Sequence, residues 1–250
     1  MVSKIQVSPY STLAPIYDHV MLHVDYKKWA SYIIKIIHKF AKHSRTILDV
    51  SCGTGSCCYH LKKSGFYVVG MDAAFPMVQQ AHLKYRNLNI PFLCADMQYP
   101  ALRPGFDVII SLYDSMNYLL SEQSWNICLD HLYVLLNRHG LLIFDVSTVH
   151  NSKTDFSQYV QKEELNRGSY KRSSWFDTQT LIQTNQFEIS YNDTPQKIFC
   201  ETHQQKIRYL DDIKHMVSNS AFEYVNAFKD FTFQPHSERC ERVHFVLRKS

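Results

Sequence analysis

Two short stretches of the sequence carry groups that could hold a nucleotide-like ligand. The first is an apolar run that ends in Asp49 and continues as Ser-Cys-Gly-Thr-Gly over residues 51–55. The second apolar run, residues 66–71, ends in Asp72. Glycines allow the backbone to approach a ligand where a Cβ atom would collide, and a carboxylate after the second strand can accept both hydroxyls of a ribose. Together these features predict an adenosine-containing ligand at the carboxyl edge of a parallel sheet.

The spacing within the first stretch is Asp49-x-Ser51-x-Gly53-x-Gly55, which differs from the GxGxxG fingerprint of dinucleotide-binding dehydrogenases. The pattern resembles motif I of the class I S-adenosylmethionine-dependent methyltransferases, whose usual form is acidic-x-Gly-x-Gly-x-Gly. Ser51 stands in the first glycine position, where a positive φ would strain a serine. The alternative is an ordinary strand-to-helix turn, which the correctly spaced Asp72 disfavours. The resemblance implies S-adenosyl-L-methionine as the cofactor.

The same resemblance implies where the adenine lies. Asp96 follows the third expected strand, at the position where the family binds the adenine amino group, and the backbone of Met97 would face the ring. Ala73 and Met77 could also line the adenine, although a methionine in a first helical turn is more often part of a core. The alternative for Asp96 is a solvated loop carboxylate.

The methyl group is expected beyond the fourth strand, because ligands of open α/β sheets lie outside the carboxyl ends of the strands. Residues 112–115, with Leu112 and Tyr113 first among them, should therefore face the methionine half of the cofactor or the methyl group. Asp114 could hold the methionine amine, act as a base, or cap the following helix. The N-terminal run over residues 13–29 resembles that of a subgroup of small bacterial methyltransferases with an antiparallel insertion. It implies that Tyr17 closes over the cofactor; the alternative is a purely packing role.

Two residues of the later sequence are candidates for the acceptor side. Residues 201–209 and the tail at 231–239 resemble the same subgroup, so the resemblance covers nearly the whole chain, and it implies that Glu201 or His203 projects into the acceptor pocket. A methyl on a sulfonium needs an aligned, unprotonated nucleophile, so one base suffices. The candidates are His203, Glu201 and Asp114, and a histidine is best suited near neutral pH. The alternative is that His203 points outward from its strand. The other histidines lack metal-ligand spacing, so no metal site is expected.

An alternation of strands and helices must position these residues. Strands are expected at 46–50, 66–71, 91–94, 107–112 and 141–146, with helices at 56–64, 76–85 and 122–136. This βαβ order predicts an α/β, doubly wound, Rossmann-like sheet with right-handed crossovers. Two late strands at 224–233 and 242–247 are expected to complete it as a seven-stranded sheet.

Three segments are expected along the chain. Residues 1–150 hold N-terminal helices and the cofactor-binding core, with a short helix opened by Pro15 and a longer one that starts at Trp29. Residues 151–209 form a small antiparallel insertion, read as a lid, with three or four strands between 170 and 209. Residues 210–250 supply a helix at 210–218 and the terminal strand hairpin.

The composition indicates which cellular compartment and which kinds of partner to expect. The chain has 250 residues, 45% of them hydrophobic, and no apolar run long enough to span a bilayer or to serve as a signal core. Seven cysteines without any CxxC pair favour reduced thiols in a cytoplasm. A net charge of +4 from scattered basic residues permits contact with nucleic acid but does not argue for it. The oligomeric state is not encoded in any visible pattern.

These observations predict a methyltransferase that acts on a small-molecule acceptor of unknown identity. An RNA methyltransferase, for example one acting on tRNA, is the first alternative, and it is disfavoured because no basic, aromatic-rich module is present. A non-catalytic scaffold that keeps the fold is the second, suggested by Ser51. An NAD oxidoreductase is a weaker third, because the glycine spacing does not fit.

Overall fold

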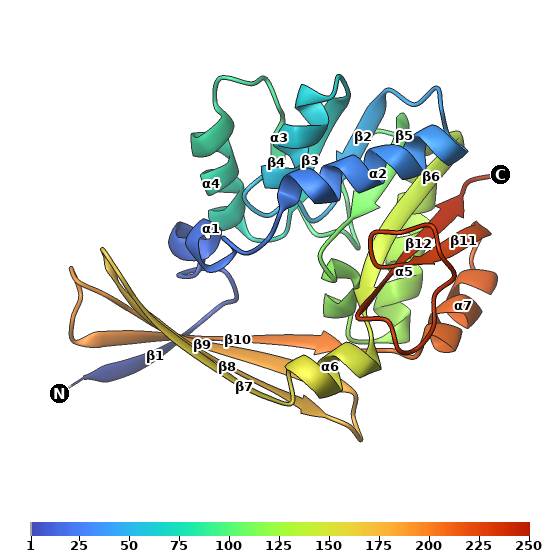
Figure 1. Ribbon diagram of the computed structural model, residues 1–250. Coiled ribbons are helices and arrows are strands. Elements are labelled where there is room, and N and C mark those ends of the chain that lie inside the picture. The colour runs from blue at the N-terminus through green and yellow to red at the C-terminus, as the bar shows by residue number, and fades with distance from the viewer. Residues whose placement is uncertain (1) are drawn as a thin grey trace.

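The structure is a computed structural model that describes residues 2–250 and contains two β-sheets (Figure 1). The larger sheet has seven strands in the order β11-β12-β6-β5-β2-β3-β4. They are β2 (Thr46–Asp49), β3 (Tyr67–Asp72), β4 (Phe92–Cys94), β5 (Phe106–Ser111), β6 (Leu136–Ser147), β11 (Glu223–Lys229) and β12 (Arg242–Arg248). Strands β4, β3, β2, β5 and β6 run parallel, and β12 and β11 form an antiparallel hairpin beside β6. The predicted doubly wound, seven-stranded sheet is confirmed.

Helices cover both faces of this sheet. One face packs against α2 (Tyr26–Phe40), α3 (Ser56–Lys63) and α4 (Phe75–Tyr85), and the other against α5 (Glu122–Leu135) and α7 (Leu210–Ser218). Because both faces are covered, the central strands are nearly continuous apolar runs, as in β5, where Val108, Ile109 and Ile110 are fully buried. No helix within residues 2–250 is both long enough and apolar enough to cross a membrane.

The N-terminal helices follow the expected order with one shift. A 3-10 turn at Ala14–Ile16 and a short helix α1 (Tyr17–Val20) begin where Pro15 predicted a helix start. The longer helix α2 begins at Tyr26, so the prediction of a start at Trp29 was wrong by three residues. The reason is a cap at Asp25, whose Oδ1 accepts a hydrogen bond of 2.9 Å from the backbone N–H of Lys28.

The second sheet has five strands in the order β1-β10-β9-β8-β7. Four of them follow β6 and the short helix α6 (Val149–Asp155), namely β7 (Gln158–Leu165), β8 (Gly168–Asp177), β9 (Ile182–Tyr191) and β10 (Lys197–Lys206). They form the predicted antiparallel insertion, which begins earlier than expected. The fifth strand is β1 (Ser3–Val7), which pairs parallel with β10 and was not predicted. The expected segment boundaries stay a prediction, but residues 3–7 join the sheet of the insertion.

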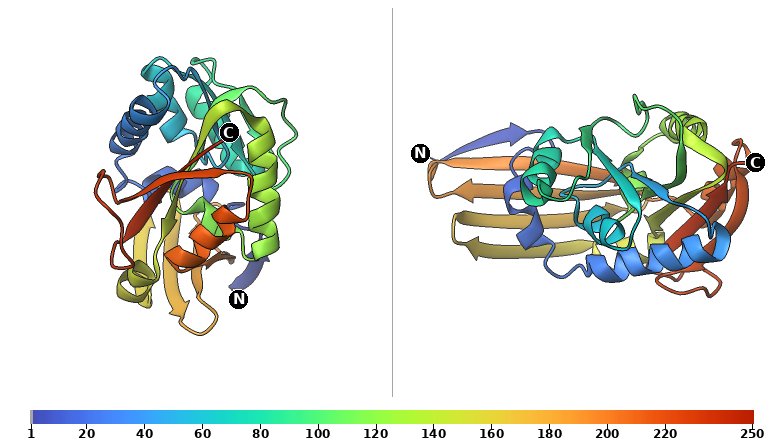
Figure 2. Two further views of the ribbon diagram at one scale, coloured as in Figure 1. Left: turned by 90° about the vertical axis from the view of Figure 1, so that its right-hand side faces the viewer. Right: turned by 90° about the horizontal axis from the view of Figure 1, so that it is seen from above.

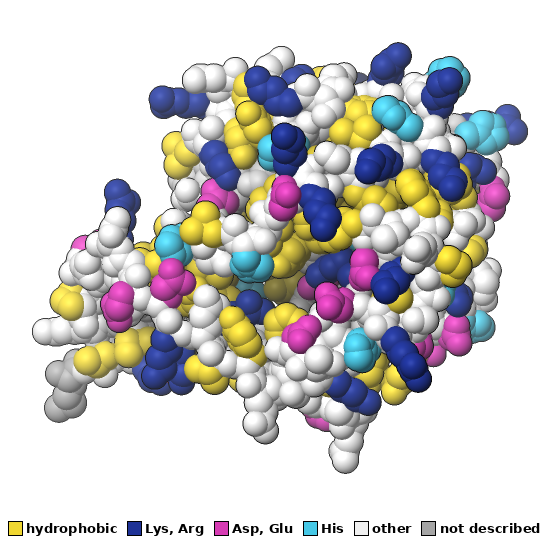
Figure 3. Space-filling model, viewed as in Figure 1, with side chains coloured by type: hydrophobic (Ala, Val, Ile, Leu, Met, Phe, Trp, Pro, Cys, Tyr) yellow, Lys and Arg dark blue, Asp and Glu magenta, His cyan; other side chains and the backbone are white. Residues whose placement is uncertain are grey.

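The two sheets meet where the parallel strands of the larger one end. Figure 2 shows the five-stranded sheet extending away from the helical layers, with the N-terminal end on its outer side and the C-terminal end at the opposite end of the molecule. The surface is hollowed between the two parts, and basic side chains lie within the hollow (Figure 3). This junction is the place where the sequence predicts a ligand.

Candidate active site

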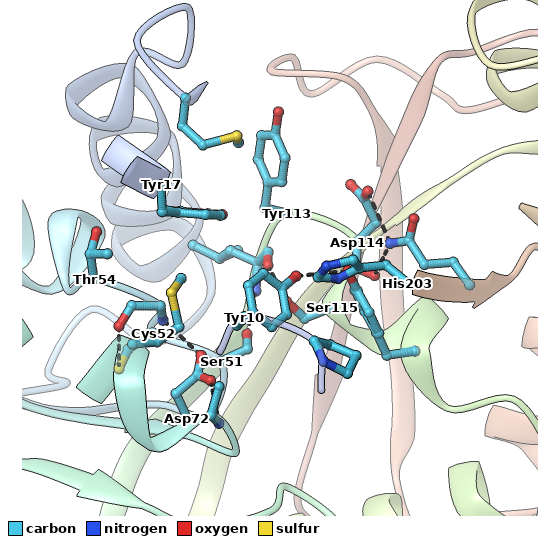
Figure 4. A pocket seen from close by; sticks show the side chains of 18 of the residues that line it. Tyr10, Tyr17, Ser51, Cys52, Thr54, Asp72, Tyr113, Asp114, Ser115 and His203 are labelled. Atoms are coloured by element: carbon cyan, nitrogen blue, oxygen red, sulfur yellow. Dashed lines mark hydrogen bonds between the residues drawn. The ribbon is translucent and has the colours of Figure 1, made fainter. Parts of the chain in front are cut away.

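A cavity of about 470 Å³ occupies the junction between the two sheets. Its walls come from the loops after β2, β3, β4 and β5, from the N-terminal helices, and from the inner faces of β8, β9 and β10 (Figure 4). Thirteen of the predicted site residues line it: Tyr17, Asp49, Ser51, Gly53, Asp72, Ala73, Met77, Asp96, Met97, Leu112, Tyr113, Asp114 and His203. The other two predicted residues, Gly55 and Glu201, do not. The volume falls in the range of about 300–1,000 Å³ that is usual for small-molecule sites.

The glycine loop after β2 forms the floor of the cavity. Gly53 has φ +55°, a conformation that favours glycine, and it lines the cavity directly. Gly55, with φ +81°, lies behind the loop, where an added Cβ would come within 2.7 Å of the Phe92 ring. Gly55 therefore packs against Phe92, and its contact with the cofactor stays a prediction. Ser51 is not among the residues with positive φ, so the strain considered for a serine at this position does not arise.

Asp72 is fixed at the end of β3 by the loop beside it. Its Oδ2 accepts a hydrogen bond of 2.9 Å from the N–H of Gly53, and its Oδ1 accepts one of 2.9 Å from the N–H of Ala74. Burial raises the pKa of Asp72, and the two backbone hydrogen bonds oppose that rise. Each carboxylate oxygen keeps acceptor capacity toward the cavity. This arrangement fits a pair of ribose hydroxyls.

Asp49 is a buried carboxylate that has no cation beside it among residues 2–250. Its side chain accepts hydrogen bonds from the Ser51 N–H at 3.2 Å and from the Cys58 thiol at 3.5 Å. Burial raises the pKa of Asp49 to about 7. A positively charged ligand group beside Asp49 would stabilise its ionised carboxylate and oppose the effect of burial. The site thus fits a ligand that brings its own ammonium group.

The loop after β5 holds two strained residues. Tyr113 and Asp114 have φ values of 61° and 54°, and their backbone N–H groups both donate to Asp145, at 2.7 and 2.9 Å. The guanidinium of Arg242 is ion-paired with both Asp114 and Asp145. Positive φ at two successive non-glycine residues persists only where surrounding contacts enforce it. Asp145 supplies that restraint and was missed because it lies within a buried strand and belongs to no motif.

The Asp114 carboxylate lines the cavity and forms an ion pair with Arg242. Burial raises the pKa of Asp114, and the ion pair opposes that rise. Its side chain does not cap the helical turn that follows at residues 115–118. Its roles as a base or as a partner of the methionine amine stay predictions, and in the structure it helps to fix the position of Arg242 at the cavity wall.

His203 and Glu201 lie next to each other on β10, and only His203 reaches the cavity. Its Nε2 lies 3.1 Å from Glu201 Oε2, and its Nδ1 lies 3.2 Å from the Tyr118 hydroxyl. The Glu201 carboxylate also accepts hydrogen bonds of 2.6 to 2.8 Å from the backbone N–H groups of Tyr10, Thr12 and Leu13. Of the two residues predicted as alternatives for the acceptor pocket, the structure brings His203 to the cavity and not Glu201. The N-terminal loop occupies its oxygens.

Three tyrosines close the space between the two halves of the cavity. The Tyr10 hydroxyl lies 2.7 Å from that of Tyr118, and the Tyr10 and Tyr17 rings meet edge to face with centroids 6.0 Å apart. Figure 4 shows Tyr10 between the Asp72 side and the His203 side of the cavity. Burial raises the pKa of all three hydroxyls, so they remain neutral phenols. Of the three, only Tyr17 was predicted, because the others belong to no recognisable motif.

Comparisons with known proteins agree with this geometry. Residues 47–140 match a family model described as a methyltransferase domain. The chain therefore contains a methyltransferase domain and has the fold of the class I S-adenosylmethionine-dependent methyltransferases.

Two relatives are similar to this chain over nearly their whole length. Two bacterial proteins, both named "Putative methyltransferase", are 29% identical (Geobacillus sp. strain WCH70) and 28% identical (YqeM of Bacillus subtilis strain 168) to this chain. Each alignment covers 96% of this chain, and 99% and 97% of the relatives. The crystal structure of an S-adenosylmethionine-dependent methyltransferase from Clostridium acetobutylicum has the same fold, with a TM-score of 0.82 at 21% identity over 96% of this chain and 98% of that one.

Proposed function

We propose that the chain binds S-adenosylmethionine beside β2 and β3 and methylates a small molecule held against the five-stranded sheet. The observation that carries this proposal is that the glycine loop, Asp72 and the inner faces of β8, β9 and β10 line one continuous cavity. When bound, the cofactor supplies a methyl group already activated on a sulfonium.

The cofactor half of the cavity offers a partner for each part of the ligand. Asp72 would accept the ribose hydroxyls, and Asp49 would pair with the methionine ammonium. The adenine would lie between Met77 and Met97, with Asp96 at its edge. Water would be excluded from the bound cofactor by four other side chains of the cavity wall, those of Ala73, Leu112, Tyr113 and Tyr17.

On the acceptor half, His203 is the proposed proton acceptor. Glu201 accepts from Nε2, which leaves Nδ1 to accept from the Tyr118 hydroxyl. The phenols of Tyr118 and Tyr10 can then turn a hydroxyl or amine of the acceptor toward the methyl group. A proton leaving that group would pass to His203 directly or through Tyr118.

A small acceptor is favoured over RNA because the tyrosines and the five-stranded sheet roof the cavity. A polynucleotide would need an open basic track, and the arginines of the cavity wall lie inside the fold instead. All seven cysteines are unpaired, which supports a reducing compartment such as the cytoplasm.

Calorimetric titration with S-adenosylhomocysteine tests the cofactor assignment. Asp72→Ala should weaken binding by about 1–3 kcal/mol, because two hydrogen bonds to a carboxylate are lost. Gly53→Val should abolish binding, because its side chain would occupy ligand space in a strained backbone conformation. Asp130→Ala, which removes an exposed carboxylate of α5 outside the cavity, is the matched control. Unchanged affinity in both site variants would reject the assignment.

A further inference from the structure

The inner face of the five-stranded sheet is polar where a buried sheet face is normally apolar. Cross-strand register places Ser174, Asn185 and His203 in one row and Phe176, Gln183 and Gln205 in the next. The side chains of Gln183, Asn185, His203 and Gln205 are at most 5% exposed. Burying amides is unfavourable unless each finds hydrogen-bond partners. A face built this way is suited to a polar ligand.

Arg172 is the cationic member of this face. It lies on β8 opposite Phe187, one row from Asn185. Its Nε and Nη2 donate to Asn185 Oδ1 at 3.2 and 2.8 Å, and the Ser174 hydroxyl donates to the same oxygen at 2.6 Å. The Phe156 and Phe187 rings flank the guanidinium at 5.5 and 5.7 Å. These contacts fix the orientation of the planar group but leave donors free to bind a ligand.

Arg172 and Arg242, the two arginines that line the cavity, differ in their ion pairs. Arg242 is ion-paired with both Asp114 and Asp145. Across residues 2–250, no Asp or Glu carboxylate forms an ion pair with Arg172. An arginine that lines the cavity with free N–H donors and no paired carboxylate offers a binding partner to an anionic group of the ligand.

Arg172 lies close to His203, the proposed proton acceptor. The Phe187 ring lies 5.7 Å from the Arg172 guanidinium carbon and 5.4 Å from the His203 ring, so one side chain separates the two groups. The Arg172 charge also acts on the Tyr113 and Tyr118 hydroxyls, where it partly offsets the rise in pKa that burial causes. An acceptor that touches both groups must be compact.

We infer that the acceptor is a small carboxylic acid, whose carboxylate pairs with Arg172 while its amino or hydroxyl group faces His203 and Tyr118. This inference rests on the proposed function and specifies its substrate class. A planar carboxylate can accept two parallel N–H donors from one guanidinium, which accounts for recognition by an arginine rather than a lysine. The step itself moves the methyl from sulfur to the nitrogen or oxygen, which loses its proton, and leaves S-adenosylhomocysteine.

The test uses the full chain, methyl-labelled S-adenosylmethionine and a small-metabolite extract as the acceptor source. Four proteins are compared: wild type, Arg172→Gln, Arg172→Lys, and Arg167→Gln, which removes an exposed arginine of the β7–β8 turn as a matched control. We expect Arg172→Gln to lower label transfer at least about 100-fold, Arg172→Lys to recover part of it, and Arg167→Gln to leave it unchanged. Affinity for S-adenosylhomocysteine should stay within about twofold throughout, because Arg172 is assigned to the acceptor half.

Chemical treatment of the extract decides which anion is bound. Amidating its carboxylates with a carbodiimide and excess methylamine should abolish transfer, whereas alkaline phosphatase should not affect it. Acetate should inhibit the wild type, and neutral acetamide should not. Loss of transfer after phosphatase treatment, or a full rate in Arg172→Gln, would overturn the inference while leaving the proposed function intact. A wild-type protein that fails to bind S-adenosylhomocysteine would instead reject the proposed function, and the inference with it.

Discussion

Glu201 and His203, two residues apart on β10, point to the same side of the strand and meet through a contact of 3.1 Å between Oε2 and Nε2. The same carboxylate holds the backbone of the N-terminal loop at Tyr10, Thr12 and Leu13. One buried charge therefore orients the proposed proton acceptor and secures the loop that brings Tyr10 into the cavity. Orientation of His203 and closure of the site are coupled through Glu201.

Substituting Glu201→Gln should loosen this loop. We expect the free energy of unfolding to fall by about 2 kcal/mol, because charge-assisted hydrogen bonds become neutral ones and the donors on the replaced oxygen, such as the Tyr10 N–H and His203 Nε2 at Oε2, lose their acceptor. Urea unfolding measures this effect, and hydrogen exchange should quicken at the amides of Tyr10, Thr12 and Leu13. Glu164→Gln, at an exposed position of β7, is the control.

The pH dependence of the same variant has a definite sign. Hydrogen bonds hold the pKa of Glu201 below its ordinary value of 4.5 despite burial. Its stabilising contribution is therefore present above pH 4.5 and is lost as the pH falls. Wild type should lose stability more steeply than Glu201→Gln on acidification, and parallel curves for the two proteins would contradict the assignment.

Removing the imidazole should affect catalysis and leave cofactor binding intact. His203→Gln is expected to lower kcat about 100-fold, the usual scale for loss of a general base. If the proton passes through Tyr118, then Tyr118→Phe should slow the reaction too, and the double variant should be little slower than His203→Gln alone. Label transfer under saturating cofactor measures these rates. Strictly additive losses would show that the two residues act independently.

Cofactor affinity should fall at acidic pH because of Asp49. Its pKa of about 7 lies above the ordinary value of 3.8, so below neutrality the carboxylate must release a proton before it can pair with a ligand ammonium. We expect the Kd for S-adenosylhomocysteine to rise as the pH is lowered from 8 to 5.5, by up to about tenfold per unit. Asp49→Asn should bind more weakly but with a shallower pH profile, and Asp72, whose pKa burial also raises, should account for the slope that remains.

Gly70 in β3 offers a test of packing beneath the site. A Cβ added there would come within 2.6 Å of the Phe92 ring and 3.0 Å of the Cys52 sulfur. Gly70→Ala should therefore lower the free energy of unfolding by about 1–3 kcal/mol through overpacking. In a double variant with Phe92→Leu the two losses should be less than additive. Chemical denaturation of the four proteins gives the coupling, and a coupling of zero would mean that the backbone shifts instead.

The parallel core was predictable because its signals are local. Strands β2, β3 and β5 are short apolar runs that stay apolar on both faces, and glycines or a proline mark the adjoining helix ends. Strands β1 and β7 were missed because most of their residues are exposed, which leaves no hydrophobic alternation to detect. Pairing of β1 with β10 also joins segments at opposite ends of the chain, which no local pattern encodes.

The cofactor half and the acceptor half of the site also differed in how well their residues could be predicted from the sequence. Asp49, Asp72 and Asp96 were identifiable because each stands beside a strand end, where position alone directs it to the sheet edge. Arg172 and Asn185 were not, because their direction depends on strand register in the insertion. Glu201 could not be told apart from His203 for a related reason: it lies on the inward side of its strand, but a loop from the N-terminal region takes up its carboxylate.

Strand alternation divides β8, β9 and β10 by residue parity. Arg172, at an even-numbered position of β8, faces the cavity, as do odd-numbered positions of β9 and β10, such as 185 and 203. Exchanging side chains at these positions changes the acceptor chamber without altering the backbone pairing of the ladder. We expect a combinatorial library restricted to these positions to change which acceptor is methylated. The proposed cofactor site at Asp49 and Asp72 would stay the same.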